Sequence, residues 1–198
     1  MSQLTLTSDP LGSATTGTFE FENPAFFMTG ATSQRGAVLV DQYLLQQSTY
    51  TLANSTSAQK LFNVTTNGAV TLVAGTYEFE CQFSLSSMSA TSGSFGFALG
   101  GGATLTQYWW SLANKATLAT AAAGQVTYNT AANTAIATAS TATVAFARIH
   151  GVVIVTVGGT LIPQVSLGVG AAAVVGIGSF FKIRALGGAA AASSGNWS

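Results

Sequence analysis

The sequence predicts an all-β fold, an antiparallel sandwich of two sheets. Several segments alternate apolar and polar residues with a period of two, the pattern of strands that are buried on one face. Glycine, asparagine and proline residues separate these segments at short intervals, and no segment keeps a helical period beyond a turn or two. About nine to eleven short strands are expected. The glycine-rich pieces do not recur at a fixed period, which excludes a solenoid.

Residues 1–35 are expected to form an N-terminal arm that contains a β-hairpin. Residues 18–22 alternate, Asn23 and Pro24 interrupt the pattern, and residues 25–29 resume it. A two-stranded hairpin is only marginally stable alone, so its aromatic side chains need a neighbour, either the main body or another chain. These aromatic residues are Phe19, Phe21, Phe26 and Phe27.

Residues 36–187 are expected to form the sandwich itself. Residues 36–40 open it, and residues 43–45 continue it as a strand or as a short helical turn. Further short strands are predicted at residues 50–52 and 60–64.

The strongest strand prediction covers residues 75–85. One face carries Tyr77, Phe79, Cys81, Phe83 and Leu85, and the other carries Glu78, Glu80, Gln82 and Ser84. Alternation this strict is typical of a half-buried antiparallel strand, with Cys81 as a small core residue. Two carboxylates at this spacing can bind Ca²⁺ or act as acid and base. Since no third carboxylate and no histidine lies nearby in the sequence, Glu78 and Glu80 are interpreted as solvated.

Residues 94–99 predict another strand, and residues 105–112 a third that contains the aromatic trio Tyr108, Trp109 and Trp110. Adjacent side chains of a strand point to opposite faces, so at least one of the trio is expected to face outward or into a subunit contact. Packing in a core or an interface is the favoured interpretation, because burial of large aromatic side chains is strongly stabilising. Stacking on a sugar is the alternative.

The chain from residue 117 onward is poor in charge. Residues 117–142 are mostly alanine, threonine, asparagine and serine, with one plausible strand at 125–128. Residues 143–167 are predicted to form a strand pair that turns at Gly158 and Gly159, in which residues 152–157 are buried on both sides. A final strand is predicted at 177–186. The tail, residues 188–198, has a disordered composition and contains Trp197.

The composition favours assembly with other subunits. Only 6% of the 198 residues are charged, against about 25% in an ordinary soluble domain, and the net charge is zero. Such a surface is expected to be covered by neighbouring subunits, or else to be solubilised by serine, threonine, asparagine and glutamine. Lysine and arginine are scattered, so neither nucleic acid nor an anionic membrane is an expected partner. The first residues show no secretory signal pattern, so synthesis in a cytoplasm is expected.

The residues that carry most enzyme chemistry are rare. Cys81 is the single cysteine and His150 the single histidine, so a zinc site, a disulfide and a catalytic triad are not expected. Gly100, Gly101 and Gly102 lack the helix and lysine that would follow in a phosphate-binding loop. No catalytic, cofactor-binding or metal-binding residue is predicted, and the chain is expected not to be an enzyme.

Several short motifs resemble known jelly rolls. Residues 68–79, with Gly75, Tyr77 and Phe79, and the aromatic last strand resemble the C1q and tumour-necrosis-factor domains. A closer resemblance is to structural proteins of tailed bacteriophages. It is carried by Gly17-Thr18-Phe19-Glu20-Phe21, Ser33-Gln34-Arg35-Gly36, Tyr77-Glu78-Phe79-Glu80 and Gly178-Ser179-Phe180-Phe181-Lys182-Ile183. This resemblance implies a C1q/TNF-like jelly-roll sandwich that forms a homotrimer, with either Phe181 and Ile183 or Phe180 in the threefold seam. It implies no catalytic residue.

The resemblance leads to two functional hypotheses. In the first, the chain is a virion structural protein, a trimeric capsid decoration or cement protein that binds the major capsid protein over capsomer junctions at the virion surface. The arm residues Phe19, Phe21, Phe26 and Phe27, together with Trp197, would then clasp the shell. In the second, the chain is a receptor-binding tip or short tail fibre that binds host surface glycans through Tyr108, Trp109 and Trp110.

Overall fold

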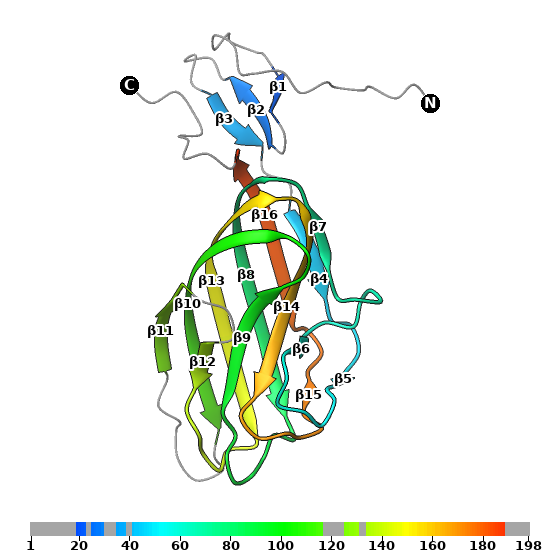
Figure 1. Ribbon diagram of the computed structural model, residues 1–198, viewed down its shortest axis with the longest axis vertical. Coiled ribbons are helices and arrows are strands. Elements are labelled where there is room, and N and C mark those ends of the chain that lie inside the picture. The colour runs from blue at the N-terminus through cyan, green and yellow to red at the C-terminus, as the bar shows by residue number, and fades with distance from the viewer. Residues whose placement is uncertain are drawn as a thin grey trace.

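The computed structural model describes residues 19–22, 25–29, 35–38, 41–116, 125–130 and 134–188. These residues contain strands and no helix, so the all-β prediction is confirmed. Two antiparallel sheets pack face to face as a β-sandwich, with the smaller sheet in front in Figure 1. A three-stranded sheet formed by the N-terminal part of the chain is separate from both in its pairing.

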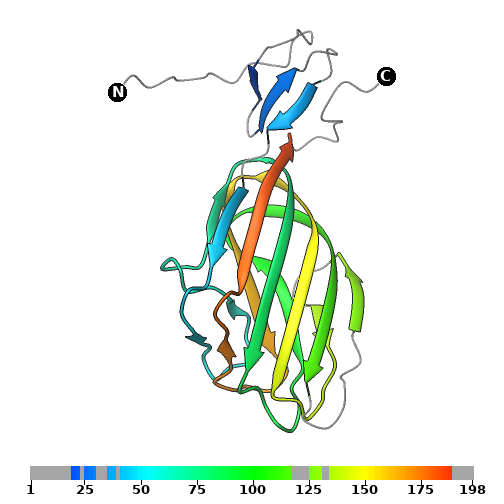
Figure 2. The same cartoon turned by 180° about the vertical axis from the view of Figure 1, so that it is seen from behind.

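The larger sheet has the strand order β11-β10-β13-β8-β16-β4, and Figure 2 shows its strands side by side. Two very short strands, β15 and β5, lie in line with β16 and β4. Strand β15 pairs with the end of β8, along the same edge with which β16 pairs. The bounds are β4 (Asp41–Leu45), β5 (Tyr50–Thr51), β8 (Gly75–Ser86), β10 (Thr104–Ala116), β11 (Gln125–Asn129), β13 (Val144–Val157), β15 (Val174–Val175) and β16 (Phe180–Gly187).

The smaller sheet has the order β12-β9-β14, and β6 and β7 both pair with the remaining edge of β14. Its strands are β6 (Gln59–Lys60), β7 (Val70–Leu72), β9 (Phe95–Gly100), β12 (Thr134–Ala137) and β14 (Gly159–Leu167). The strand β12 was not predicted, because alanine and threonine give it no clear alternation.

Consecutive strands cross repeatedly between the two sheets. When the β10–β11 hairpin is set aside, the chain alternates between the larger and the smaller sheet from β4 to β16, except at the step from β9 to β12, which both belong to the smaller sheet. The predicted strand pair at residues 143–167 is therefore wrong: β13 and β14 belong to different sheets, and Gly158 lies at the crossover. A tight turn between two strands does not require that they pair, since it can also carry the chain across the sandwich.

The N-terminal sheet consists of β1 (Phe19–Glu22), β2 (Ala25–Thr29) and β3 (Arg35–Val38) in that order. The expected hairpin is present, with Phe21 opposite Phe26. Strand β3 pairs with β2, so this sheet extends to Val38, beyond the boundary expected at residue 35. Residues 36–38 thus complete the N-terminal sheet and do not open the sandwich.

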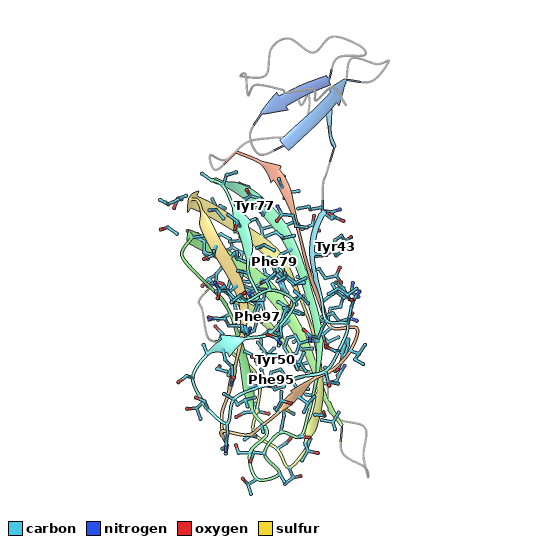
Figure 3. The ribbon with its side chains drawn as sticks, turned by 90° about the vertical axis from the view of Figure 1, so that its right-hand side faces the viewer. Tyr43, Tyr50, Tyr77, Phe79, Phe95 and Phe97 are labelled. Carbon is cyan, nitrogen blue, oxygen red and sulfur yellow. The ribbon has the colours of Figure 1, made fainter. Side chains whose placement is uncertain are left out.

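The core lies between the two sheets and is rich in aromatic side chains. Strand β8 alternates as predicted, with Tyr77, Phe79, Cys81, Phe83 and Leu85 all buried. The Phe79 ring stacks on Phe97 of the smaller sheet at 6.5 Å and on Phe181 of β16 at 5.9 Å, and Figure 3 shows Phe79 and Phe97 in this layer.

Strand β13 is continuous through Gly151 and buries only one of its faces. Val153 and Val155 are buried, whereas Val152 and Ile154 are half-buried on the other face. The prediction that residues 152–157 are buried on both sides is therefore wrong. A run of β-branched residues satisfies the strand preference on an exposed face as well as on a covered one.

Candidate binding surface

The outward face of the larger sheet, turned away from the smaller sheet, carries a row of side chains that crosses six strands. The register places Trp110 opposite His150, His150 opposite Glu80, and Glu80 opposite Lys182. Tyr128 extends the row on one side and Tyr43 on the other. The row therefore has aromatic residues at both ends and charged residues in the middle.

At one end lies the β10–β11 flank, an exposed apolar surface formed by Tyr108, Trp110, Leu112, Val126 and Tyr128. Trp110 is 44% exposed and Val126 74% exposed. The indole of Trp110 stacks on the His150 imidazole, with ring centroids 5.6 Å apart and an interplanar angle of 19°. The Tyr128 ring is tilted against it at 5.2 Å. Two neighbouring rings thus fix the orientation of Trp110.

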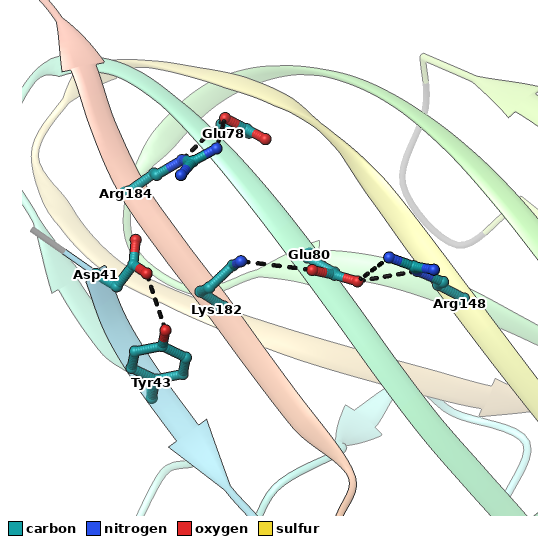
Figure 4. Close-up of polar contacts among 7 residues, drawn as sticks. All are labelled: Asp41, Tyr43, Glu78, Glu80, Arg148, Lys182 and Arg184. Carbon is teal, nitrogen blue, oxygen red and sulfur yellow. Dashed lines mark hydrogen bonds and ion pairs between the residues drawn. The ribbon is translucent and has the colours of Figure 1, made fainter. Parts of the chain in front are cut away.

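The middle of the row is a set of cross-strand ion pairs (Figure 4). Arg148 donates to Oε1 of Glu80 from Nε at 2.9 Å and from Nη2 at 2.7 Å, and Lys182 Nζ lies 3.5 Å from Oε2 of Glu80. Arg184 donates from Nε and Nη2 to Oε2 of Glu78 at 2.9 and 2.7 Å, and this hydrogen bonding raises the pKa of Arg184. Both carboxylates are thus held in fixed orientations.

Half of the charged residues of the whole chain lie on this one sheet face. The members are Asp41, Glu78, Glu80, Arg148, Lys182 and Arg184. Glu78 and Glu80 were interpreted as solvated, but both are partly covered and ion-paired. The sequence did contain a signal for these ion pairs, because Glu78 and Glu80 have the same spacing along the chain as Lys182 and Arg184. Matched spacing of opposite charges is favourable on neighbouring strands.

At the other end lies the β4–β16 flank, formed by Tyr43, Leu45 and Phe180. Tyr43 is 59% exposed, and its hydroxyl donates a 2.8 Å hydrogen bond to Oδ2 of Asp41. That hydrogen bond raises the pKa of Tyr43. The two flanks are separated by the ion-paired middle of the sheet.

A hollow of about 510 Å³ opens on this face beside Trp110. Its walls include Trp110, Leu112 and Val126 from the β10–β11 flank and Glu78, Glu80, Arg148 and His150 from the middle of the sheet. The hollow therefore combines an apolar wall with fixed hydrogen-bonding groups.

The structure separates the predicted aromatic trio. Trp109 is 0% exposed and packs edge-on against Phe97 at 5.5 Å, so it is a core residue and cannot contact a ligand directly. Tyr108 and Trp110 point to the outward face, as the alternation requires.

Two of the three residues predicted for the threefold seam are also in the core. Phe181 and Ile183 are buried between the sheets and cannot line a seam, whereas Phe180 is partly exposed on the outward face. The candidate clasping residues Phe19, Phe21, Phe26 and Phe27 lie on β1 and β2, and their side chains lie outside what the structure describes. Trp197 lies outside the described residues.

The described residues form no cluster of metal ligands, and the single cysteine is buried. Among the described residues no three His, Cys, Asp or Glu side chains lie close enough to hold a metal ion. Burial raises the pKa of the Cys81 thiol well above its ordinary value, which disfavours the thiolate nucleophile. Within the described part of the chain, no helix has the length and apolar character needed to span a membrane.

No protein-family model matches this chain, and no curated protein is significantly similar to it in sequence. The sandwich and the outward face of its larger sheet are therefore the features that bear on its function.

Proposed function

We propose that the sandwich is a jelly roll with one inserted hairpin. The alternation of consecutive strands between two sheets supports this, because four strands in each sheet joined in this way make two Greek keys. The larger sheet would contribute β4, β16, β8 and β13. The smaller sheet would contribute β12, β9, β14 and the β6–β7 edge. The β10–β11 hairpin then widens the larger sheet beyond β13.

We further propose that the protein is a virion structural protein of a tailed bacteriophage, a trimeric decoration protein that stabilises the capsid. The observation that carries the proposal is the exposed apolar β4–β16 flank on a chain in which only 6% of residues are charged. Exposed apolar patches on charge-poor surfaces are typical of protein contacts. The number of three subunits and the phage context come from the motif resemblance.

The β4–β16 flank is the surface proposed for sister subunits. Tyr43, Leu45 and Phe180 offer aromatic and aliphatic area whose burial contributes about 25 cal/mol per Å² before the costs of association. In a cyclic trimer the flank would meet a different surface of the next copy. That contact would be heterologous, and a closed ring of such contacts gives a cyclic oligomer.

Sedimentation of the full chain tests the assembly. We expect a trimer at micromolar concentration, and we expect Phe180→Glu to shift it toward monomer because a carboxylate would be buried in the contact. Val169→Glu is the control, since Val169 is an exposed apolar residue that lies outside this sheet face. A stable monomeric wild type, or equal effects of the two substitutions, would refute the proposed contact.

Copy number on the particle tests the decoration role. Quantitative mass spectrometry of phage particles that carry the protein should find it in large excess over single-copy tail components. A few copies per particle would favour the alternative role, a receptor-binding tip or short tail fibre. That alternative is supported by the exposed Tyr108 and Trp110.

A further inference from the structure

We propose that the hollow beside Trp110 is a saccharide-binding site that takes a neutral sugar. The inference goes beyond the assembly role and does not depend on it, because the hollow lies at the β10–β11 flank and the proposed subunit contact lies at the β4–β16 flank. Its volume of about 510 Å³ falls within the range of about 300–1,000 Å³ typical of small-molecule sites.

The first argument is the preorganised aromatic wall. The Trp110 ring is held by the stacked His150 ring and by the tilted Tyr128 ring, yet 44% of the residue is exposed. A rigid, amphipathic aromatic surface binds at little entropic cost, because no side chain has to be ordered on binding. These two rings cover the faces of the indole, so a sugar would lie against its exposed edge and against the neighbouring Leu112 and Val126, which offer apolar contacts to the C–H groups of the sugar ring.

The second argument is the set of polar groups beside that wall. Arg148 and Lys182 fix the Glu80 carboxylate, and Arg184 fixes Glu78 through Oε2 alone. Among the described residues Oε1 of Glu78 has no hydrogen-bond donor, so it remains free to accept one. Hydroxyl groups of a sugar can donate to these carboxylate oxygens in charge-assisted hydrogen bonds.

The third argument excludes other occupants. A phosphate or another anion would need a cation to bind, and Arg148, Lys182 and Arg184 on this face are each already paired with Glu80 or Glu78. The apolar face of a second protein would strip water from Glu80 and Arg148 without replacing their hydrogen bonds, which is costly. Sugar hydroxyls both donate and accept, so they can take the place of that water.

The experiment is a glycan-array measurement with the full chain, followed by titration of the oligosaccharides that bind. The array should hold neutral oligomers of glucose, galactose, mannose and N-acetylglucosamine, with uronic-acid and phosphorylated glycans as anionic comparators. We expect binding to neutral oligosaccharides, a loss of at least about tenfold in affinity for Trp110→Ala, and retained binding for Trp110→Phe, which keeps a ring and reports that the fold is intact. Phe146→Ala is the matched control, because Phe146 is an exposed aromatic residue of the same sheet face that lies outside the hollow and outside the proposed subunit contact.

Several results would overturn the proposal. They are no binding to any neutral glycan, a preference for the anionic ones, and equal losses for Trp110→Ala and Phe146→Ala. Dissociation of the oligomer by Trp110→Ala would show that the hollow is a contact between copies. Sedimentation is measured separately from glycan binding, so failure of the trimer and failure of the sugar site are distinguishable.

Discussion

Replacement of Phe79 by alanine should cause a large loss of stability. Phe79 is buried and connects the two sheets, because its ring stacks on Phe97 of β9 and on Phe181 of β16. Truncation of a buried phenylalanine to alanine costs about 3–5 kcal/mol, which includes the transfer term and the cavity left behind. Loss of two aromatic pairs at once places the expected value toward the upper end of that range.

Urea denaturation followed by tryptophan fluorescence measures this loss. With a slope of about 2 kcal/mol per molar urea, the midpoint should fall by roughly 1.5–2.5 M. Subunit concentration must be held constant, because association would make the midpoint concentration-dependent. Phe146→Ala is the control, since Phe146 is exposed on β13. If the two substitutions lower the midpoint equally, Phe79 does not link the sheets as described.

Two further predictions concern backbone packing and titration. A Cβ added at Gly151 would lie 2.6 Å from Cβ of Trp109 and against the Tyr108 carbonyl, so Gly151→Ala should destabilise by about 1–3 kcal/mol. Thermal unfolding should show no such loss for Gly188→Ala, whose Cβ would meet nothing within 4 Å. Burial raises the pKa of the Cys81 thiol, so the folded state keeps that proton to a higher pH than the unfolded state does. Stability is therefore full below a pH of about 8.5 and falls above it. Denaturation between about pH 7 and pH 10 should show a smaller pH slope in Cys81→Ala, and equal slopes would contradict a buried thiol.

Alternation in the sequence was sufficient to predict the best strands and their buried faces. Strand β8 has the predicted core residues, and the opposite orientations of Trp109 and Trp110 follow from the period of two. The same rule would have placed Phe181 in the core, because it alternates with Lys182, which needs water. The seam prediction for Phe181 was wrong because the alternation of side chains along the strand, and not aromatic character, decides which face a side chain occupies.

The sequence does not predict which strands pair with one another. The turn at Gly158 is compatible with a hairpin and with a crossover. The packing of the two sheets against each other decides between these two connections. The hollow depends on which strands pair. Trp110 on β10 and Glu80 on β8 line it together because β13 pairs with both strands and lies between them. Residues far apart in the sequence become one site through pairings that no local pattern encodes.

The placement of charge on this face is itself an argument for function there. Ion pairs between exposed side chains contribute about 0.2–1 kcal/mol, so Arg148 with Glu80 adds little to the stability of the sandwich. A chain so poor in charge nevertheless has half of its ionised groups on this one sheet face. Fixed, mutually neutralised charges orient a partner and exclude wrong ones more than they stabilise a fold. Stability alone does not explain the pattern, whereas the proposed recognition at the hollow beside Trp110 would give a role to the three charged residues that line it, Glu78, Glu80 and Arg148.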